Sequence, residues 1–347
     1  MKKNNIFLIY GTVIAAYIII QLLMSAGAVT SSLRGQLVPI CAYIVMAVSL
    51  NLTVGVLGEL SLGHAGFMSI GAFTGVVACM SLESALPPTL PRFVISLLVG
   101  AAFAGVAGFL IGIPVLRLNG DYLAIVTLAF GEIIKNIINC LYVGIDSRGL
   151  HLSFLTNSDA LNLEEGGTVI INGPMGIAGI TKLSTFTFGF ALVLVALFIV
   201  LNLIRSRAGR AIMALRDNRI AAESIGINVT KYKLMAFVTS SALAGAAGTL
   251  FALNYSTITA AKFNFNTSIL VLVFVVLGGL GNIWGSIIGA TVLYILPEIL
   301  RGFADYRMLV YAVVLILVML MTNSEGLKQL KENILKKPGR SRGSVEA

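Results

Sequence analysis

Charged residues are scarce in this sequence of 347 residues: they make up 11% of it, whereas hydrophobic residues make up 57%. A soluble globular domain carries about 25% charged residues, so this chain has too little charge to cover a surface that faces water. We therefore expect lipid to surround most of it. The formal net charge of +9 is then a signal of membrane topology rather than of nucleic-acid binding.

Residues that bind metals or nucleotides are also few. The three cysteines lie in or beside apolar runs and form no CxxC pair, and the two histidines, His64 and His151, stand apart. This pattern predicts no metal site. The sequence holds no GxxxxGK[ST] phosphate-binding loop, so we expect the chain to hydrolyse no ATP itself. These absences predict a protein that is not an enzyme and has no cofactor of its own.

Apolar segments long enough to cross a membrane recur along the whole chain, since a span needs about 20 apolar residues. Ten of them are found, at approximately 6–26, 36–55, 60–80, 92–115, 121–143, 185–204, 233–255, 267–280, 283–299 and 308–322. The first resembles a signal peptide but exceeds the usual apolar length of about 7–15 residues, which favours an uncleaved span. The eighth and ninth are short, so they form either two spans or a re-entrant pair.

The basic residues predict the orientation of these spans. With both termini in the cytoplasm, sixteen lysines and arginines fall in cytoplasmic segments and seven in outer segments, as the positive-inside rule expects. We therefore predict a transmembrane domain over residues 1–327 and a basic cytoplasmic tail over 328–347. Within the domain we expect a polar outer loop at 144–184, with a turn at "NGPMG" (172–176), and a charged cytoplasmic segment at 205–232.

The charged segment has the composition of a docking helix. On a single helix of about 100° per residue, residues 210–226 place Arg216, Arg219 and Glu223 beside an arc of mostly small residues. That arc holds Ala211, Ala214, Leu215, Ala221, Ala222 and Ile225, with Asn218 in its middle. Gly226 suits the left-handed position after a helix end. Because a helix lying on lipid would bury large apolar residues, we favour docking against a cytoplasmic protein.

Few ionisable residues lie within the predicted spans, which argues against a carrier driven by protons or sodium ions. Glu132 and Lys135 are three residues apart on one segment and can neutralise each other. We interpret this pair as structural, with a proton relay as the alternative, and His64 as a hydrogen-bonded packing residue. A transport unit with a docking segment and no energy source of its own predicts a separate ATPase.

Small residues at four-residue spacing predict close packing of the helices in lipid. Three segments carry such a series: Gly71 and Gly75; Ala104, Gly108 and Gly112; and Ser240, Ala244, Gly248 and Ala252. The pattern is common in membrane proteins and predicts no particular solute.

Five stretches together resemble one family. They are "GELSLGHAGFMSIGAFTG" (58–75), "LNGDYLAIVTLAFGEIIKN" (118–136), "NGPMGI" (172–177), "RAIMALRDNRIAAESIGINVTKYKLMAFVTSSALAGAAGTLFA" (210–252) and "GGLGNIWGSIIGA" (278–290). They are similar to the LivM-type permease subunit of bacterial high-affinity branched-chain amino acid ABC importers. The resemblance implies an all-α polytopic fold of about ten helices, type II-like, in the bacterial cytoplasmic membrane. It also implies partners: a second homologous permease, two ABC ATPase subunits that bind ATP and Mg, and a periplasmic or lipid-anchored solute-binding protein that delivers Leu, Ile or Val.

The resemblance and the helix pattern together suggest site residues. For ATPase docking they are Arg210, Ala214, Arg216, Asp217, Asn218, Ala221, Ala222, Glu223 and Gly226. The candidates for the translocation path are Ser61, His64, Phe67, Thr127 and Glu132. The outer loop would help to receive the binding protein, but its "IINGPMGI" departs from the richer Gly/Thr run of the family, which leaves its role open.

Other functions remain open at this stage. The same permease role could serve urea, short amides or other amino acids, because a path for apolar side chains needs no charged residue. A secondary carrier or channel that works alone is a second class, and a structural membrane protein is a third.

Overall fold

The computed structural model describes residues 3–27, 30–83, 89–118, 120–146, 149–154, 161, 167–300, 309, 312, 313 and 316. The chain divides into two units, Met1–Tyr294 and Ile295–Ala347. In the second unit the described residues are the end of one helix, Leu300, and the helical residues 309, 312, 313 and 316. Most of the predicted span at 308–322 and the whole predicted tail at 328–347 lie outside the described residues.

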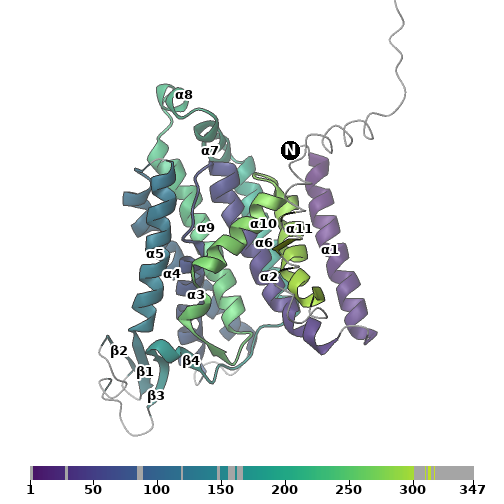
Figure 1. The fold of residues 1–347 in the computed structure, drawn as a ribbon, viewed down its shortest axis with the longest axis vertical. Helices are drawn as coiled ribbons and strands as arrows, with labels where there is room; N and C mark the ends of the chain where they lie inside the picture. Colours follow the sequence, from purple (N-terminus) through teal and green to yellow (C-terminus); the bar gives the residue numbers. More distant parts are fainter. Residues whose placement is uncertain are drawn as a thin grey trace, which may run out of the picture. The chain divides into compact units, whose positions relative to one another are not determined.

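Long apolar helices build the first unit (Figure 1). They are α1 (Lys3–Ser25), α2 (Ser31–Asn51), α3 (His64–Ser81), α4 (Thr89–Val115), α5 (Asp121–Asn139), α6 (Phe186–Arg205), α9 (Val229–Ala252), α10 (Phe265–Gly278) and α11 (Ile283–Ile299), the last of which ends in the second unit. Seven helical segments in the described part of the chain are long and apolar enough to cross a membrane, and α1 and α11 contribute shorter apolar helices. The prediction of a polytopic, mainly helical membrane protein is confirmed.

Helix α2 lies at the centre of this unit. It begins at Ser31, five residues before the predicted start, and continues beyond Asn51 as a π-helix, η1 (Leu52–Leu57). Every residue from Leu37 to Leu57 is buried, because α2 is surrounded by α6, α9 and α10. At Gly58 the backbone turns into the left-handed region, with φ of 82°, and the π-helix ends.

Helices α3, α4 and α9 approach one another closely through small residues. A Cβ atom added at Gly71 would lie 2.1 Å from the carbonyl oxygen of Gly245, and one added at Gly248 would lie 2.0 Å from that of Met68. In a bilayer, where water does not drive helices together, such close backbone contact supplies much of the association. The predicted small-residue faces are therefore confirmed as helix–helix contacts.

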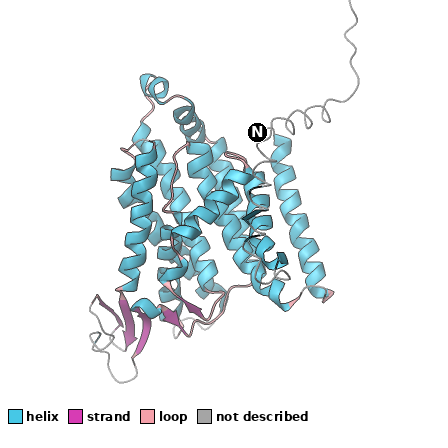
Figure 2. Cartoon of the chain, viewed as in Figure 1, coloured by secondary structure: helices cyan, strands magenta, loops and turns pink. Residues whose placement is uncertain are grey.

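An antiparallel sheet lies at one end of the helices (Figure 2). Its strands are β1 (Tyr142–Asp146), β2 (Gly149–Ser153), β3 (Thr168–Asn172), β4 (Ile177–Ala178) and β5 (Thr257–Ile258), in the order β2-β1-β3-β4-β5. Four strands come from the region predicted as a polar loop, and β5 follows α9. The expectation of helices alone omitted this sheet. The predicted turn is confirmed as the 3₁₀ turn η3 (Gly173–Met175) between β3 and β4.

Two short helices, α7 (Arg207–Asp217) and α8 (Arg219–Ser224), lie at the end opposite the sheet (Figure 1). They connect α6 to α9, so the chain leaves the bundle and re-enters it at this end. The segments at 144–184 and 205–232, which were expected on opposite sides of the membrane, thus lie at opposite ends of the helices.

Candidate functional site

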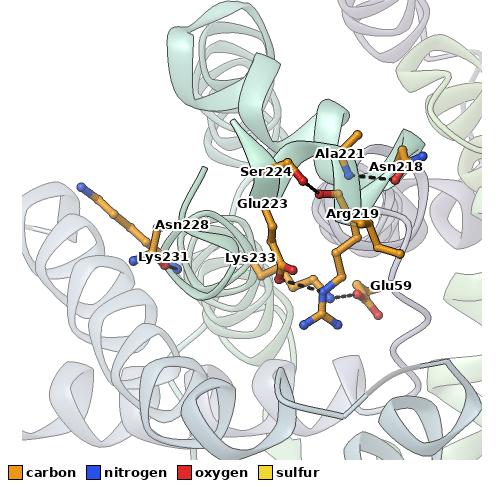
Figure 3. Close-up of polar contacts among 10 residues, drawn as sticks. Glu59, Asn218, Arg219, Ala221, Glu223, Ser224, Asn228, Lys231 and Lys233 are labelled. Carbon is orange, nitrogen blue, oxygen red and sulfur yellow. Dashed lines mark hydrogen bonds and ion pairs between the residues drawn. The ribbon is translucent and has the colours of Figure 1, made fainter. Parts of the chain in front are cut away.

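Asn218 divides the charged segment into two helices (Figure 3). Its backbone is extended, with φ of −155° and ψ of 104°, and its side-chain Oδ1 accepts a hydrogen bond of 3.1 Å from the Ala221 N–H. This is the N-cap geometry that asparagine favours, because it satisfies a backbone donor in the first turn of α8. The prediction of one continuous helix over 210–226 is therefore wrong. The arc of small residues does not continue across Asn218.

The predicted docking residues differ in exposure. The exposed members are Arg210, Arg216, Asp217, Asn218, Ala221, Glu223 and Gly226. Ala214 is half-buried and Ala222 is buried against the protein itself. Ile220 and Ile225 are each 77% exposed, although only Ile225 was expected on the docking face. Exposed large apolar side chains indicate a contact surface, so the expected docking face is not made of small residues alone.

The charges of α8 form a surface ion pair. Arg219 Nε lies 3.3 Å from Glu223 Oε1, and both side chains are more than 40% exposed. A surface pair contributes little stability of its own, so these groups can change partners at low cost. Beyond them Gly226 has φ of +84°, which confirms the predicted left-handed position after the helix.

Arg216 points back toward the bundle. Its Nη1 donates a hydrogen bond of 2.9 Å to the carbonyl oxygen of Gly55, in the π-helix η1. Its Nη2 and Nε donate to Asp217 Oδ1 at 3.0 and 3.2 Å. The guanidinium thus joins the docking segment to the end of the central helix, a contact that the sequence did not predict.

Asn51 continues this connection inside the bundle. It is fully buried, and its Oδ1 accepts a hydrogen bond of 2.8 Å from the Gly281 N–H. Its Nδ2 donates to Ser286 Oγ, also at 2.8 Å. A Cβ atom added at Gly55 would lie 1.9 Å from Asn51 Oδ1 and 2.2 Å from the Gly281 nitrogen. A continuous set of contacts therefore runs from α7 through η1 to the turn between α10 and α11.

A second connection at this end is the ion pair between Lys233 and Glu59 (Figure 3). The Lys233 side chain is 5% exposed and that of Glu59 is 14% exposed. The pair joins the loop after η1 to the first turns of α9. Removing one partner would leave a charge buried and unpaired. The docking segment is thus held to the bundle by Arg216 before α8 and by Lys233 after it.

His64, a path candidate, belongs to a buried polar cluster. Its Nε2 lies 2.7 Å from Ser49 Oγ. Ser240 Oγ donates to the Ser49 carbonyl oxygen at 2.6 Å, and Thr53 Oγ1 donates to Ser240 Oγ at 2.8 Å. These bonds join α2, α3 and α9, and the interpretation of His64 as a hydrogen-bonded packing residue is confirmed.

The other path candidates separate into buried and half-exposed residues. Phe67 is 1% exposed and lies in the core. Thr127 is buried, and its Oγ1 accepts a hydrogen bond of 3.1 Å from the Leu62 N–H. Ser61 is buried and its hydroxyl has no partner within the part of the chain that the structure describes. Glu132 is the most exposed of the five candidates, and it pairs with Lys135.

An apolar pocket of about 690 Å³ lies between α3, α4, α5 and the sheet. Among the described residues, no charged side chain lines it. Burying an unpaired charge in such surroundings is costly, so the pocket suits hydrocarbon and not a charged solute. No group of three metal-binding side chains occurs in the described ranges.

The fold and these contacts define a class: a multi-pass membrane protein with a peripheral two-helix segment linked to its core. Residues 32–319 match the family model described as the branched-chain amino acid transport system permease component. The chain therefore belongs to this permease family. It is a transport subunit of the cytoplasmic membrane rather than an enzyme, and it works with separate ATPase and solute-binding partners.

Curated relatives agree with this assignment. The chain is 36% identical over 311 residues to the high-affinity branched-chain amino acid transport system permease protein LivM of Salmonella typhimurium, covering 87% of this chain and 71% of the relative. It is 34% identical, with the same coverage, to LivM of Escherichia coli. It is also 27% identical to the ribose import permease protein RbsC of Haemophilus influenzae, over 82% of this chain and 83% of the relative. No solved structure gives a significant match.

Proposed function

We propose that this chain carries leucine, isoleucine and valine across the cytoplasmic membrane, after a solute-binding protein has delivered them. The observation that supports this most strongly is the similarity to two LivM proteins over 87% of the chain. ATP and Mg would bind to two ATPase subunits and not to this chain. A second, homologous permease would complete the membrane part.

We further propose that α7 and α8 dock into the ATPase on the cytoplasmic side. The exposed Ile220 and Ile225 would provide apolar contact, and Arg219 and Glu223 would fix the register by pairing with charges of the partner. The sheet would then face the outside and help to receive the binding protein. Arg216 would carry a displacement of α7 to η1 and onward to the turn at Gly281.

A second candidate is the same transport role for another small solute. The identity of 27% to a ribose permease favours a scaffold that serves chemically different solutes. In this case the coupling segment would work in the same way and only the path would differ. A carrier that works alone lacks such an observation in its favour.

Uptake of labelled leucine in cells with and without this gene tests the proposal, repeated after deletion of the cognate ATPase gene. We expect uptake to require both genes. If a strain that lacks this gene and every related permease gene took up leucine normally, the solute of this permease would be a compound other than leucine. Uptake that needs this chain but not the ATPase would contradict the mechanism.

Glu223→Lys is expected to lower uptake by about tenfold, the equivalent of ~1.4 kcal/mol of docking energy. The new ammonium would face Arg219, and like charges on neighbouring turns repel. The exposed position means that the permease should still fold. Co-purification of the ATPase and leucine uptake are the measurements. Lys231→Glu, a charge reversal at an exposed residue in the first turn of α9, is the control and should leave both normal. Normal assembly and uptake in Glu223→Lys would contradict the docking assignment.

A further inference from the structure

Helix α5 carries an ion pair inside a segment that can cross the membrane. The segment Tyr122–Asn139 is long and apolar enough to span, and Glu132 and Lys135 pair within it, with side chains 36% and 22% exposed. Ionisable residues inside a span are costly, so their presence there indicates a functional role. Glu132 lies about 10 Å and Lys135 about 6 Å from the end of α5 that leads into the sheet, at about 1.5 Å per residue.

The surroundings of the pair indicate which face of α5 it occupies. Asn136 is exposed beside it, and Ile133 and Ile137 are 53% and 49% exposed. A partly exposed ion pair and an exposed amide are poorly placed against hydrocarbon. We therefore place the pair and Asn136 along a path that admits water and solute, while Ile133 and Ile137 form an apolar surface beside them.

The charges of the pair match those of an amino acid. A free amino acid is a zwitterion, with one carboxylate and one ammonium group, and it carries no net charge. The Lys135 ammonium can donate hydrogen bonds to the solute carboxylate while the Glu132 carboxylate accepts them from the solute ammonium. Every charge then exchanges one partner for another and no proton moves. A simple anion would leave Glu132 unpaired, and a neutral sugar or urea would offer no charge to exchange.

We propose that Glu132 and Lys135 form a transient binding site for the zwitterionic backbone of the amino acid in transit. This inference rests on the proposed function, because it requires that the solute is an amino acid. The apolar side chain of the solute needs no charged contact, so the pair would recognise what leucine, isoleucine and valine share.

The position of Glu132 connects this site to the docking segment. Glu132 lies close to Asn264 and Ser268, at the beginning of α10, around a gap too small to admit a water molecule. The far end of α10 leads into the turn whose Gly281 N–H is held by Asn51. A solute at the ion pair thus lies beside α10, the helix that leads into the turn reached by the contacts from Arg216. Solute binding and movement of the ATPase would therefore both act on α10.

The test uses the complete importer, with both permeases, the ATPases and the binding protein, in proteoliposomes. Glu132→Gln/Lys135→Gln removes the pair without leaving an uncompensated charge, so the permease is expected to fold. We expect leucine transported per ATP to fall by about tenfold, as for the loss of a hydrogen bond to a charged group. ATPase activity stimulated by the binding protein should stay within about twofold, because docking at α7 and α8 is untouched. The control is Ser81→Ala, which removes a polar group that donates a hydrogen bond within its own helix α3, to the Val77 carbonyl oxygen at 2.7 Å, and it should transport normally.

A charge-swapped variant, Glu132→Lys/Lys135→Glu, separates binding from stability. It keeps an ion pair, so its thermal stability in detergent should equal that of the wild type. A zwitterion that binds the reversed pair must exchange the positions of its carboxylate and ammonium groups. Its side chain then points in a different direction from that in the wild type, so leucine uptake should stay low. Recovery of both stability and uptake, or normal uptake by the Gln/Gln variant, would overturn the inference and assign the pair a structural role.

The wild-type complex distinguishes this inference from the proposed function. If the wild type and the Gln/Gln variant transported leucine equally well, the proposed function would stand, and the proposal that the ion pair binds the solute would be contradicted. A wild-type complex that transports a neutral solute such as urea, and no amino acid, would contradict both.

Discussion

Gly248→Leu is expected to prevent the permease from accumulating as folded protein. A Cβ atom at this position would lie 2.0 Å from the carbonyl oxygen of Met68 and 2.8 Å from its carbonyl carbon. These are backbone atoms, so no side-chain rotation can relieve the clash, and α9 must move away from α3. Overpacking a well-packed core costs about 1–3 kcal/mol and more where the backbone must shift. We therefore expect a loss of ~3 kcal/mol or more.

The measurement is thermal unfolding of the detergent-purified permease, together with the amount of monodisperse protein on size exclusion. Gly35→Leu is a matched control in α2, because nothing lies within 4 Å of a Cβ atom added there. It should unfold at nearly the wild-type temperature. Wild-type yield and stability for Gly248→Leu would show that α3 and α9 are not packed as described.

Arg216→Met is expected to uncouple ATP hydrolysis from transport. Methionine keeps an apolar side chain against Gly58, where an added Cβ atom would lie 2.6 Å from Arg216 Cγ, so α7 should keep its place. It removes the hydrogen bond to the Gly55 carbonyl oxygen and the contacts with Asp217. Hydrogen bonds to charged groups contribute about 1.5–3 kcal/mol, so we expect transport per ATP to fall by about tenfold or more.

Leucine uptake and ATP hydrolysis, measured on the same proteoliposomes, give this ratio directly. Arg207→Met is the control: Arg207 is an exposed residue of the first turn of α7, two turns or more before Arg216. It should transport with the wild-type ratio. If Arg216→Met also kept the wild-type ratio, movement of α7 would not be transmitted through Gly55. If the Arg216→Met permease no longer bound the ATPase subunits, the role of Arg216 would be in docking and not in transmission to η1.

Apolar segments and small-residue spacing predicted most of the helices and their closest contacts. Both are local properties: about 20 apolar residues make a span, and glycine at four-residue intervals makes a face that admits another backbone. Segment 36–55 was placed correctly but began late, because Ser31, Ser32 and Arg34 are polar and still helical. The family was predicted from five motifs spread between residues 58 and 290.

The polar contacts of the candidate site were not predicted, since they join residues far apart in the sequence. Arg216 and Gly55 are 161 positions apart, and Asn51 and Gly281 are 230 apart. Arg216 was expected to face a partner because the helix pattern alone cannot show which charged residues turn inward. The break at Asn218 had a local signal, since asparagine favours N-caps, but the alanines on both sides favoured an unbroken helix.

The sheet has a mechanical consequence for any importer built on this fold. Its strands come from the connection between α5 and α6 and from the connection between α9 and α10, and β4 pairs with β5 through Ile177 and Ile258. Backbone hydrogen bonds of the sheet therefore join the ends of α5, α6, α9 and α10. The segment α7–α8 connects the opposite ends of α6 and α9. The sheet resists separation of the four helices at its own end, so we expect a displacement that begins at α7 and α8 to be larger at their end than at the sheet.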